Sequence, residues 1–391
     1  MLNSVEKGSV LQGRPVDFFR HKTGAECGYE TPRWDAFALL HPEKEEPGKV
    51  YPLVVVFHSA GHDLYSVLSC TLYEGNHDIY HVPRSMFGLY LDCREHESTD
   101  WWWGGINARG EGDPAWSGTG TQPVENRCIR TLEWTLDQFP IDRSRVYAVG
   151  NSMGGSGALG VALSRGDLFA AIKANVPAGV RHAADRCCLD LPAPDGFSIP
   201  DPPVVIDYSA QNDSWSEGHE ILYRGMREHR YSLIGFWGPF GHENNNERIR
   251  QFNDLVHSVD LYSFSTKEAY PVFTDASTDD RIPWPDGRDS TESGQVNGFF
   301  RWSILEDSEM RFSVSLRLLA PGEWETRVAL PKESVADLTF RRLQRFRLAP
   351  GEAFRYSYGD QTGCGEATAD GRPEWNRIRI TREPTVLTVV R

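Results

Sequence analysis

The stretch RVYAVGNSMGG, residues 145–155, decides the fold of this chain. Its apolar run at 145–149 predicts a strand, and the small, apolar residues at 154–165 predict a helix packed on a sheet. Between them, the pattern G-x-S-x-G places Ser152 on a tight strand-to-helix turn, where flanking glycines avoid collisions with neighbouring elements. Such a turn strains the serine backbone and exposes the hydroxyl. The stretch therefore predicts an α/β sheet with a nucleophilic serine at a strand end.

On both sides of this stretch, strand and helix patterns alternate over about 15–258. The run LVVVF at 53–57 is apolar at every position, which predicts a strand buried on both faces of a parallel sheet. We expect the other strands at 34–40, 88–92, 171–175, 204–208 and 233–237. We expect further helices at 125–138, 218–229 and 246–258. This alternation predicts a doubly wound, mostly parallel sheet with right-handed crossovers.

The sequence pattern changes near Tyr262. Prolines, glycines and short polar residues gather at 270–298, which is typical of a linker. After them, short alternating segments separated by turn signals predict strands at 310–316, 324–330, 340–348, 354–358, 375–381 and 386–390. A length of 391 residues fits two domains. We therefore expect a catalytic domain at 1–262, a linker at 263–298 and a small β-sandwich at 299–391.

A nucleophilic serine requires a general base, and the base requires a carboxylate that orients it. In α/β sheets with this serine turn, the chain order is serine, acid, histidine. Asp213 lies in the loop directly after the strand expected at 204–208. Asp207 is the alternative, but it lies inside the apolar run and fits a buried strand position. We predict Asp213 as the catalytic acid.

The base should follow the next strand, and His242 ends the loop after 233–237. It precedes the last helix expected in this part of the chain. His219 and His229 are alternatives, but both fit the solvated surface of the helix expected at 218–229. We predict His242 as the catalytic base.

Two backbone amides should bind the oxyanion that forms during acyl transfer. The amide of Met153 lies at the start of the helix after Ser152, where partial positive charge favours an anion. The second donor should lie in the turn after 53–57, and we predict the amide of Ala60. His58 ends that strand, and we expect it to shape the loop through hydrogen bonds.

Three consecutive tryptophans, Trp101, Trp102 and Trp103, follow the strand expected at 88–92. They cannot all face a core from one loop, so at least one should be exposed near the cleft. Aromatic rings stack on sugars and on aromatic acyl groups. We predict substrate binding for these three residues, and a loop packed on the sheet edge is the alternative.

No cofactor and no metal are expected. The histidines lack the HExxH and CxxC patterns of zinc sites. His58 with His62, and His77 with His81, have helical ligand spacing but no obvious third ligand. The chain has no GxxxxGK[ST] phosphate loop, and the GxGxxG match at 155–160 lies inside the helix after the serine. We therefore predict neither a nucleotide nor a dinucleotide site.

The composition of the chain indicates which classes of binding partner are expected. The formal net charge is -14 and no Lys/Arg block occurs, which argues against nucleic acid as a partner. No apolar run is long enough to cross a bilayer. The 7 cysteines form no CxxC pair, and we interpret them as mostly reduced thiols; one or two disulfides in an exported protein are the alternative. Residues 1–10 show no signal peptide, and both a cytoplasmic and a secreted location fit.

The segment KVYPLVVVFHSAG at 49–61 resembles the entry to α/β-hydrolases of the esterase and prolyl-oligopeptidase group. There, a polar turn and YPLVV lead into the oxyanion loop. The resemblance covers about 34–258 and is closest to the branch of polyhydroxybutyrate depolymerases and feruloyl or acetyl xylan esterases. The oxyanion loop of that branch usually begins His-Gly, whereas Ser59 stands at the second position here.

The resemblance implies Asp213 as the acid and His242 as the base. It also likens the β-rich C-terminal region to immunoglobulin- or fibronectin-like modules that are appended to secreted esterases.

These observations predict a serine carboxylic-ester hydrolase that works by a Ser-His-Asp triad through an acyl-enzyme. A carbohydrate-linked ester of feruloyl or acetyl type is the substrate that we expect. Two alternatives stay open. One is a serine peptidase of the prolyl-oligopeptidase-like group, against which the missing β-propeller or long N-terminal domain weighs. The other is a non-catalytic carbohydrate- or partner-binding protein with a relict triad.

Overall fold

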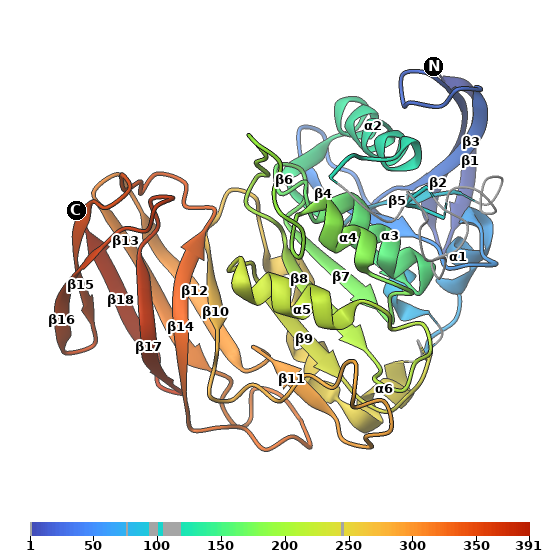
Figure 1. The fold of residues 1–391 in the computed structure, drawn as a ribbon. Helices are drawn as coiled ribbons and strands as arrows, with labels where there is room; N and C mark the ends of the chain where they lie inside the picture. Colours follow the sequence, from blue (N-terminus) through green and yellow to red (C-terminus); the bar gives the residue numbers. More distant parts are fainter. Residues whose placement is uncertain (1, 76, 94–100, 105–118, 244–245) are drawn as a thin grey trace.

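The computed structural model describes residues 2–75, 77–93, 101–104, 119–243 and 246–391. Its largest element is a 10-stranded sheet with the strand order β1-β2-β3-β5-β4-β6-β7-β8-β9-β11 (Figure 1). The strands are β1 (Leu2–Leu11), β2 (Arg14–Thr23), β3 (Arg33–Leu40), β4 (Tyr51–Phe57), β5 (Phe87–Leu91), β6 (Ile141–Asn151), β7 (Ala171–Asn175), β8 (Val204–Ser209), β9 (Leu233–Trp237) and β11 (Gly294–Val296). From β5 to β9 all neighbours run parallel, and the edges pair antiparallel.

Helices cover both faces of this sheet. They are α1 (Leu64–Cys70), α2 (Pro123–Gln138), α3 (Met153–Ala162), α4 (Arg181–Arg186), α5 (His219–Glu228) and α6 (Asn246–Phe252), with short 3-10 helices η1 (Asp78–Tyr80), η4 (Asp254–Ser258) and η5 (Leu261–Ser263). Leu53, Val55 and Phe57 of β4 share an apolar cluster with α2, α3, α4 and α5. Val54 and Val56 share the other cluster with α1 and α6. Burial on both faces explains why this strand is apolar at every position.

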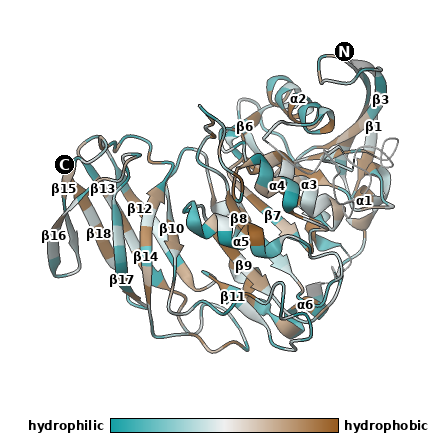
Figure 2. Cartoon of the chain, viewed as in Figure 1, coloured by the Kyte–Doolittle hydropathy of each residue, from teal (hydrophilic) through white to brown (hydrophobic). Residues whose placement is uncertain are grey.

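Helices α2 and α5 each carry both hydrophilic and hydrophobic residues. Figure 2 shows both hydrophilic and hydrophobic stretches on α2 and α5, as expected for helices that have one face on a sheet and one in water. Within the described residues, no helix is long and apolar enough to cross a membrane. All seven cysteines lie within the described residues, and no disulfide joins any of them.

The C-terminal third of the chain folds into two further antiparallel sheets. One has 3 strands in the order β10-β14-β17, and the other has 5 strands in the order β12-β13-β18-β15-β16. The strands are β10 (Tyr270–Thr274), β12 (Phe300–Asp307), β13 (Arg311–Leu318), β14 (Glu333–Arg341), β15 (Ala353–Tyr358), β16 (Gln361–Glu366), β17 (Glu374–Thr381) and β18 (Thr385–Val390).

Aromatic contacts join these two sheets. The rings of Phe273 and Phe300 stack with centroids 4.0 Å apart, and Phe312 meets Phe340 edge-on at 4.8 Å. Their cluster continues into the apolar face of the large sheet that carries α1 and α6. Figure 1 shows the two smaller sheets beside the large one, at the end away from α1 and α2.

The segment 263–298, expected as a linker, is part of the packed structure. Its strand β10 pairs with β14, and its strand β11 pairs with β9 at the edge of the large sheet. Asn297 donates from Nδ2 to the carbonyl oxygens of Leu233 in β9 and Phe273 in β10, and so connects the large sheet with the 3-stranded sheet. The polar composition was misleading because these side chains satisfy backbone groups instead of facing water.

Most expected elements of the first part are confirmed, with ends that shift by a few residues. The helix expected at 246–258 is instead α6 followed by η4. The strand expected at 324–330 is wrong, since that stretch is irregular apart from a single bridge to Pro321. The expectation missed β1, β2, β10, β11, β12 and β16, and the strand expected at 340–348 overlaps only the end of β14. The Gly-rich sequence of β16, QTGCGE, has little strand propensity, and its pairing with β15 supplies its conformation.

Candidate active site

Ser152 lies between β6 and α3, as the motif predicts. Its φ of 55° is in the left-handed region, which is rare for a serine. A side chain at either flanking glycine would collide with backbone: a Cβ on Gly150 would lie 2.1 Å from the oxygen of Gly154, and one on Gly154 would lie 2.0 Å from the oxygen of Phe57. The strand-to-helix turn is therefore possible only with glycine at these two positions.

The structure brings Asp213, His242 and Ser152 into one hydrogen-bonded chain. Nδ1 of His242 lies 2.6 Å from Oδ2 of Asp213, and Nε2 lies 2.7 Å from Oγ of Ser152. Because a carboxylate only accepts, Nδ1 carries the hydrogen and Nε2 is free to accept the serine proton. Asp213 is buried, whereas about a third of the His242 side chain is exposed. The arrangement can transfer a proton from the hydroxyl to the imidazole.

Backbone contacts hold the acid and base loops together. Oδ1 of Asp213 accepts from the amide of Trp215 at 2.8 Å. Oδ1 of Asn212 accepts from the amide of Gly241, directly before His242, also at 2.8 Å. The two loops come from the ends of neighbouring strands, β8 and β9, so the parallel sheet places them side by side.

The loop that carries Ala60 is attached to the serine turn. The hydroxyl of Ser59 donates to the carbonyl of Asn151 at 2.8 Å and lies 2.5 Å from the hydroxyl of Tyr80. A glycine at position 59 could not make these bonds, which accounts for the departure from the His-Gly pattern. Ala60 lines the same cavity as Ser152, and Met153 begins α3, whose first amides have no acceptor within the helix.

His58 is fully buried and has the structural role expected for it. Its Nδ1 donates to the carbonyl of Ser59, and its Nε2 accepts from the amide of Cys93 at 3.0 Å. These bonds fix the start of the loop and leave neither ring nitrogen for catalysis.

The prediction for the three tryptophans is corrected for two of them. Trp101 is partly exposed and lines the cavity beside Ser152. Trp102 and Trp103 are fully buried. Trp102 donates to the carbonyl of His58 at 3.0 Å, and Trp103 stacks on the ring of His182 with centroids 4.5 Å apart. The Trp102 side chain packs against Gly157 of α3, where a Cβ would lie 2.6 Å from its Cγ atom.

The alternative acid and bases lie away from Ser152. Asp207 and His219 are fully buried and contact Ser209, whose Oγ lies 2.8 Å from Nε2 of His219. Burial raises the pKa of Asp207, and this carboxylate also accepts from the hydroxyl of Tyr223. His229 is the C-cap residue of α5. None of these three groups therefore competes with Asp213 and His242 for the serine.

The cleft cavity has a volume of about 290 Å³. Sequence reasoning did not predict six of the residues that line it, namely Ser59, His62, His77, Asn151, Ala178 and Trp215. Trp215 could have been suspected because it follows Asp213 by two positions. Burial, with a smaller contribution from His62, lowers the pKa of His77 to about 4, so its imidazole is neutral at pH 7. The described residues contain one candidate metal cluster, formed by these two histidines and Cys70.

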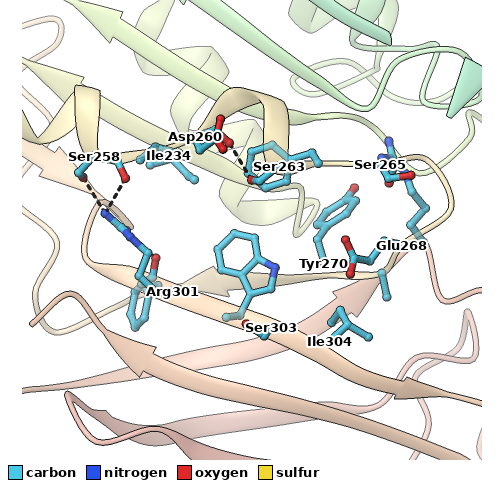
Figure 3. A pocket seen from close by; sticks show the side chains of 16 residues that line it. Ile234, Ser258, Asp260, Ser263, Ser265, Glu268, Tyr270, Arg301, Ser303 and Ile304 are labelled. Carbon is cyan, nitrogen blue, oxygen red and sulfur yellow. Dashed lines mark hydrogen bonds between the residues drawn. The ribbon is translucent and has the colours of Figure 1, made fainter. Parts of the chain in front are cut away.

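Two other cavities lie away from the serine. One, of about 660 Å³, lies beside Tyr223 and Trp284. The other, of about 310 Å³, lies between η4, η5 and β12 (Figure 3). There Arg301 points across to Ser258, and its guanidinium donates to the hydroxyl at 2.6 Å. None of the described residues lining these two cavities pairs a serine with a histidine, so neither offers an activated nucleophile.

No protein-family model matches the chain, and no curated protein matches it. Among solved structures it is similar to an S-formylglutathione hydrolase from Agrobacterium tumefaciens, with 17% identity, a TM-score of 0.41, and coverage of 61% of this chain and 92% of that one. It is similar to a thermostable esterase, with 18% identity, a TM-score of 0.43 and 63% of each chain covered.

A third solved structure is a ferulic acid esterase from Anaeromyces mucronatus, with 19% identity, a TM-score of 0.40, and coverage of 62% of this chain and 90% of that one. At this identity and TM-score, the fold is assigned from the strand order and the serine turn of the chain itself.

Proposed function

We propose that this protein is a serine carboxylic-ester hydrolase in which Ser152 is the nucleophile, His242 the general base and Asp213 the orienting acid. One observation carries the proposal: an unbroken chain of two short hydrogen bonds joins a buried carboxylate, an imidazole and a serine hydroxyl at a strained turn. Strain at a turn is retained where the surrounding structure and the chemistry require it.

The reaction follows from these contacts. His242 takes the proton of Ser152 through Nε2 while Oγ attacks the ester carbonyl carbon. Asp213 holds the imidazole in the required tautomer and stabilises its positive charge. The amides of Ala60 and Met153 bind the oxyanion. His242 then protonates the leaving alcohol, and a water activated by the same nitrogen attacks the acyl-enzyme and releases the acid.

For the substrate, we propose an ester linked to a carbohydrate, of feruloyl or acetyl type. Trp101 and Trp215 line the same cavity as Ser152 and His242 and supply aromatic surface for a sugar or a feruloyl ring. Trp102 and Trp103 no longer support this assignment, because both are buried.

We further propose a catalytic domain over 1–262 and an immunoglobulin- or fibronectin-like β-sandwich domain over 299–391. The two small antiparallel sheets with aromatic contacts between them support the second domain. The connecting segment 263–298 gives β10 to that domain and β11 to the large sheet.

The test uses a fluorophosphonate probe and a panel of substrates. We expect the probe to label Ser152, as read by peptide mass spectrometry. We expect turnover of p-nitrophenyl acetate and of a feruloylated oligosaccharide, and no turnover of peptide amides. Peptide cleavage without ester turnover would indicate the peptidase alternative. Absence of both labelling and turnover would indicate a relict triad.

A further inference from the structure

Three side chains that no proposed catalytic step uses gather beside the oxyanion loop. His62 follows that loop, Cys70 is the last residue of α1, and His77 directly precedes η1. One donor atom from each lies within 4.8 Å of the other two. In the sequence, the spacing of metal ligands singled out other pairs, His58 with His62 and His77 with His81. The cluster does not follow such a spacing, because it is the fold that brings His77 beside Cys70.

The spacing of these atoms suits a tetrahedral metal ion. Sγ of Cys70 lies 3.5 Å from Nδ1 of His77. A zinc ion bonds thiolate sulfur at about 2.3 Å and imidazole nitrogen at about 2.0–2.1 Å, so a tetrahedral sulfur–nitrogen edge is about 3.5 Å long. The rings of His62 and His77 have centroids 5.0 Å apart, and the donor atoms of all three residues lie within 4.8 Å of one another.

The surroundings of the cluster hold two of its members in place. Nδ1 of His62 lies 3.1 Å from the hydroxyl of Ser66, a contact that orients the imidazole ring. A hydrogen bond of this kind orients metal-bound histidines. Ser66 is itself held by the capping box at the start of α1, formed with Asp63. His77 adopts a left-handed backbone with φ 55° and ψ 39°, a conformation that non-glycine residues rarely keep without a reason.

The position of the cluster provides an entry path. His62 and His77 line the cleft cavity together with Ser152, while Cys70 lies buried behind them. An ion can therefore reach the thiol between the two imidazoles. Three protein ligands leave one tetrahedral position, and it opens towards the cleft.

We propose that His62, Cys70 and His77 bind one zinc ion at the wall of the cleft, with the fourth position open to water or to an oxygen atom of a ligand. Binding replaces the proton of the Cys70 thiol, which passes to solvent, and changes no oxidation state. The site goes beyond the proposed ester hydrolysis and does not depend on it. A bound ion would tie His62 and His77 to the end of α1 that carries Cys70.

The experiment titrates the metal-free, full-length chain with Zn²⁺ by calorimetry and with Co²⁺ by absorption. We expect about one ion per chain and a thiolate-to-cobalt charge-transfer band in the near ultraviolet. Cys70→Ser should abolish that band and weaken Zn²⁺ binding by about tenfold or more. His77→Asn, which tolerates the left-handed backbone, should weaken binding to a similar extent.

Two controls make the result specific. Cys364→Ser removes the exposed thiol on β16 and should leave the band and the affinity unchanged. Ser152→Ala should bind the metal as the wild type does, so loss of esterase activity and loss of metal binding are separate results. Thermal unfolding of the metal-free variants shows which of them fold. If Cys70→Ser does not fold, the His77→Asn variant provides the test, since His77 is partly exposed.

The proposal is overturned if the wild type binds no Zn²⁺. It is equally overturned if a folded Cys70→Ser or His77→Asn variant binds with wild-type affinity, or if Cys364→Ser is the change that removes binding.

Discussion

Two groups of one serine, one histidine and one aspartate occur in this molecule. The cleft group consists of Ser152, His242 and Asp213. The buried group, around β8, consists of Ser209, His219 and Asp207. Both contain a serine hydroxyl within 2.8 Å of an imidazole nitrogen, so distance alone does not separate them.

The order of contacts separates the two groups. In the cleft group the histidine stands in the middle. In the buried group the serine does: Oγ of Ser209 lies 3.1 and 3.2 Å from the two oxygens of Asp207 and 2.8 Å from His219. Nδ1 of His219 donates to the carbonyl of Ser216 at 3.0 Å, not to a carboxylate. The single hydroxyl hydrogen of Ser209 is thus shared between acid and base, and among the described residues no carboxylate contacts Nδ1 of His219 to stabilise a positive charge on the imidazole.

Access and backbone strain differ as well. Ser209, His219 and Asp207 are at most 1% exposed, and Ser209 has ordinary strand geometry inside β8. Ser152 has a positive φ and lines a cavity. The buried group is a satisfied polar network that stabilises the packing between β8 and α5. A serine, a histidine and an aspartate therefore identify a catalytic site only when the histidine lies between the other two.

Replacing the serine of each group should give the largest difference between the two groups. Ser152→Ala should lower kcat for p-nitrophenyl acetate by about 10⁶-fold, because the nucleophile is lost. Ser209→Ala should change kcat less than tenfold and lower stability by about 1–3 kcal/mol, since a buried network loses a partner. Steady-state rates and urea unfolding of both variants measure this. Equal losses of activity would contradict the distinction between the groups.

The two aspartates provide the second comparison. Asp213→Asn should lower kcat by about 10⁴-fold, because an amide favours the wrong imidazole tautomer. Asp207→Asn should leave kcat near the wild-type value, since His219 takes no part in catalysis. Rates measured on samples of verified folding check this, and a folded Asp207→Asn enzyme without activity would refute the assignment of the acid.

Neighbouring tryptophans extend the contrast between cleft and core. Trp102→Ala should destabilise the fold by about 3–5 kcal/mol, because a fully buried ring leaves a cavity. Trp101→Ala should leave stability within about 0.5 kcal/mol and raise KM for an aromatic or glycosyl ester more than it lowers kcat. Denaturant midpoints and kinetic constants separate the two. An unchanged KM would remove Trp101 from the substrate site.

Buried histidines should also make the fold sensitive to acid. Burial, with Arg186 next, lowers the pKa of His182 to about 3. Between pH 6.5 and 3 the unfolded chain therefore binds a proton that the folded chain does not, and stability falls as pH falls, by up to about 1.4 kcal/mol per unit. His182→Gln should reduce the number of protons taken up on unfolding by up to one, so the free energy of unfolding should fall less steeply with pH. Urea midpoints between pH 7 and 4 measure this slope. His81→Gln is the control, since the His81 side chain is 31% exposed, and an unaltered slope in His182→Gln would oppose the explanation.

Local sequence was sufficient for much of the fold. The strand at β4, the serine turn and the strand-helix alternation all follow from residues adjacent in the chain. Asp213 and His242 were predictable because parallel strands place the loops at their carboxyl ends on one edge. The failures came where partners are distant. β16 and β11 depend on pairing with β15 and β9, and 324–330 alternates without any strand beside it.

What the sequence by itself determined is the local geometry at Ser152, because a side chain at Gly150 would collide with the backbone oxygen of Gly154 in the same turn. What the tertiary structure decided is which side chains meet. It buried Trp102 and left Trp101 in the cleft, and it gathered His62, Cys70 and His77 around one point. The physical reason is that turns depend on clashes between near neighbours, whereas burial and ligand sets depend on packing between segments that the order of residues does not bring together.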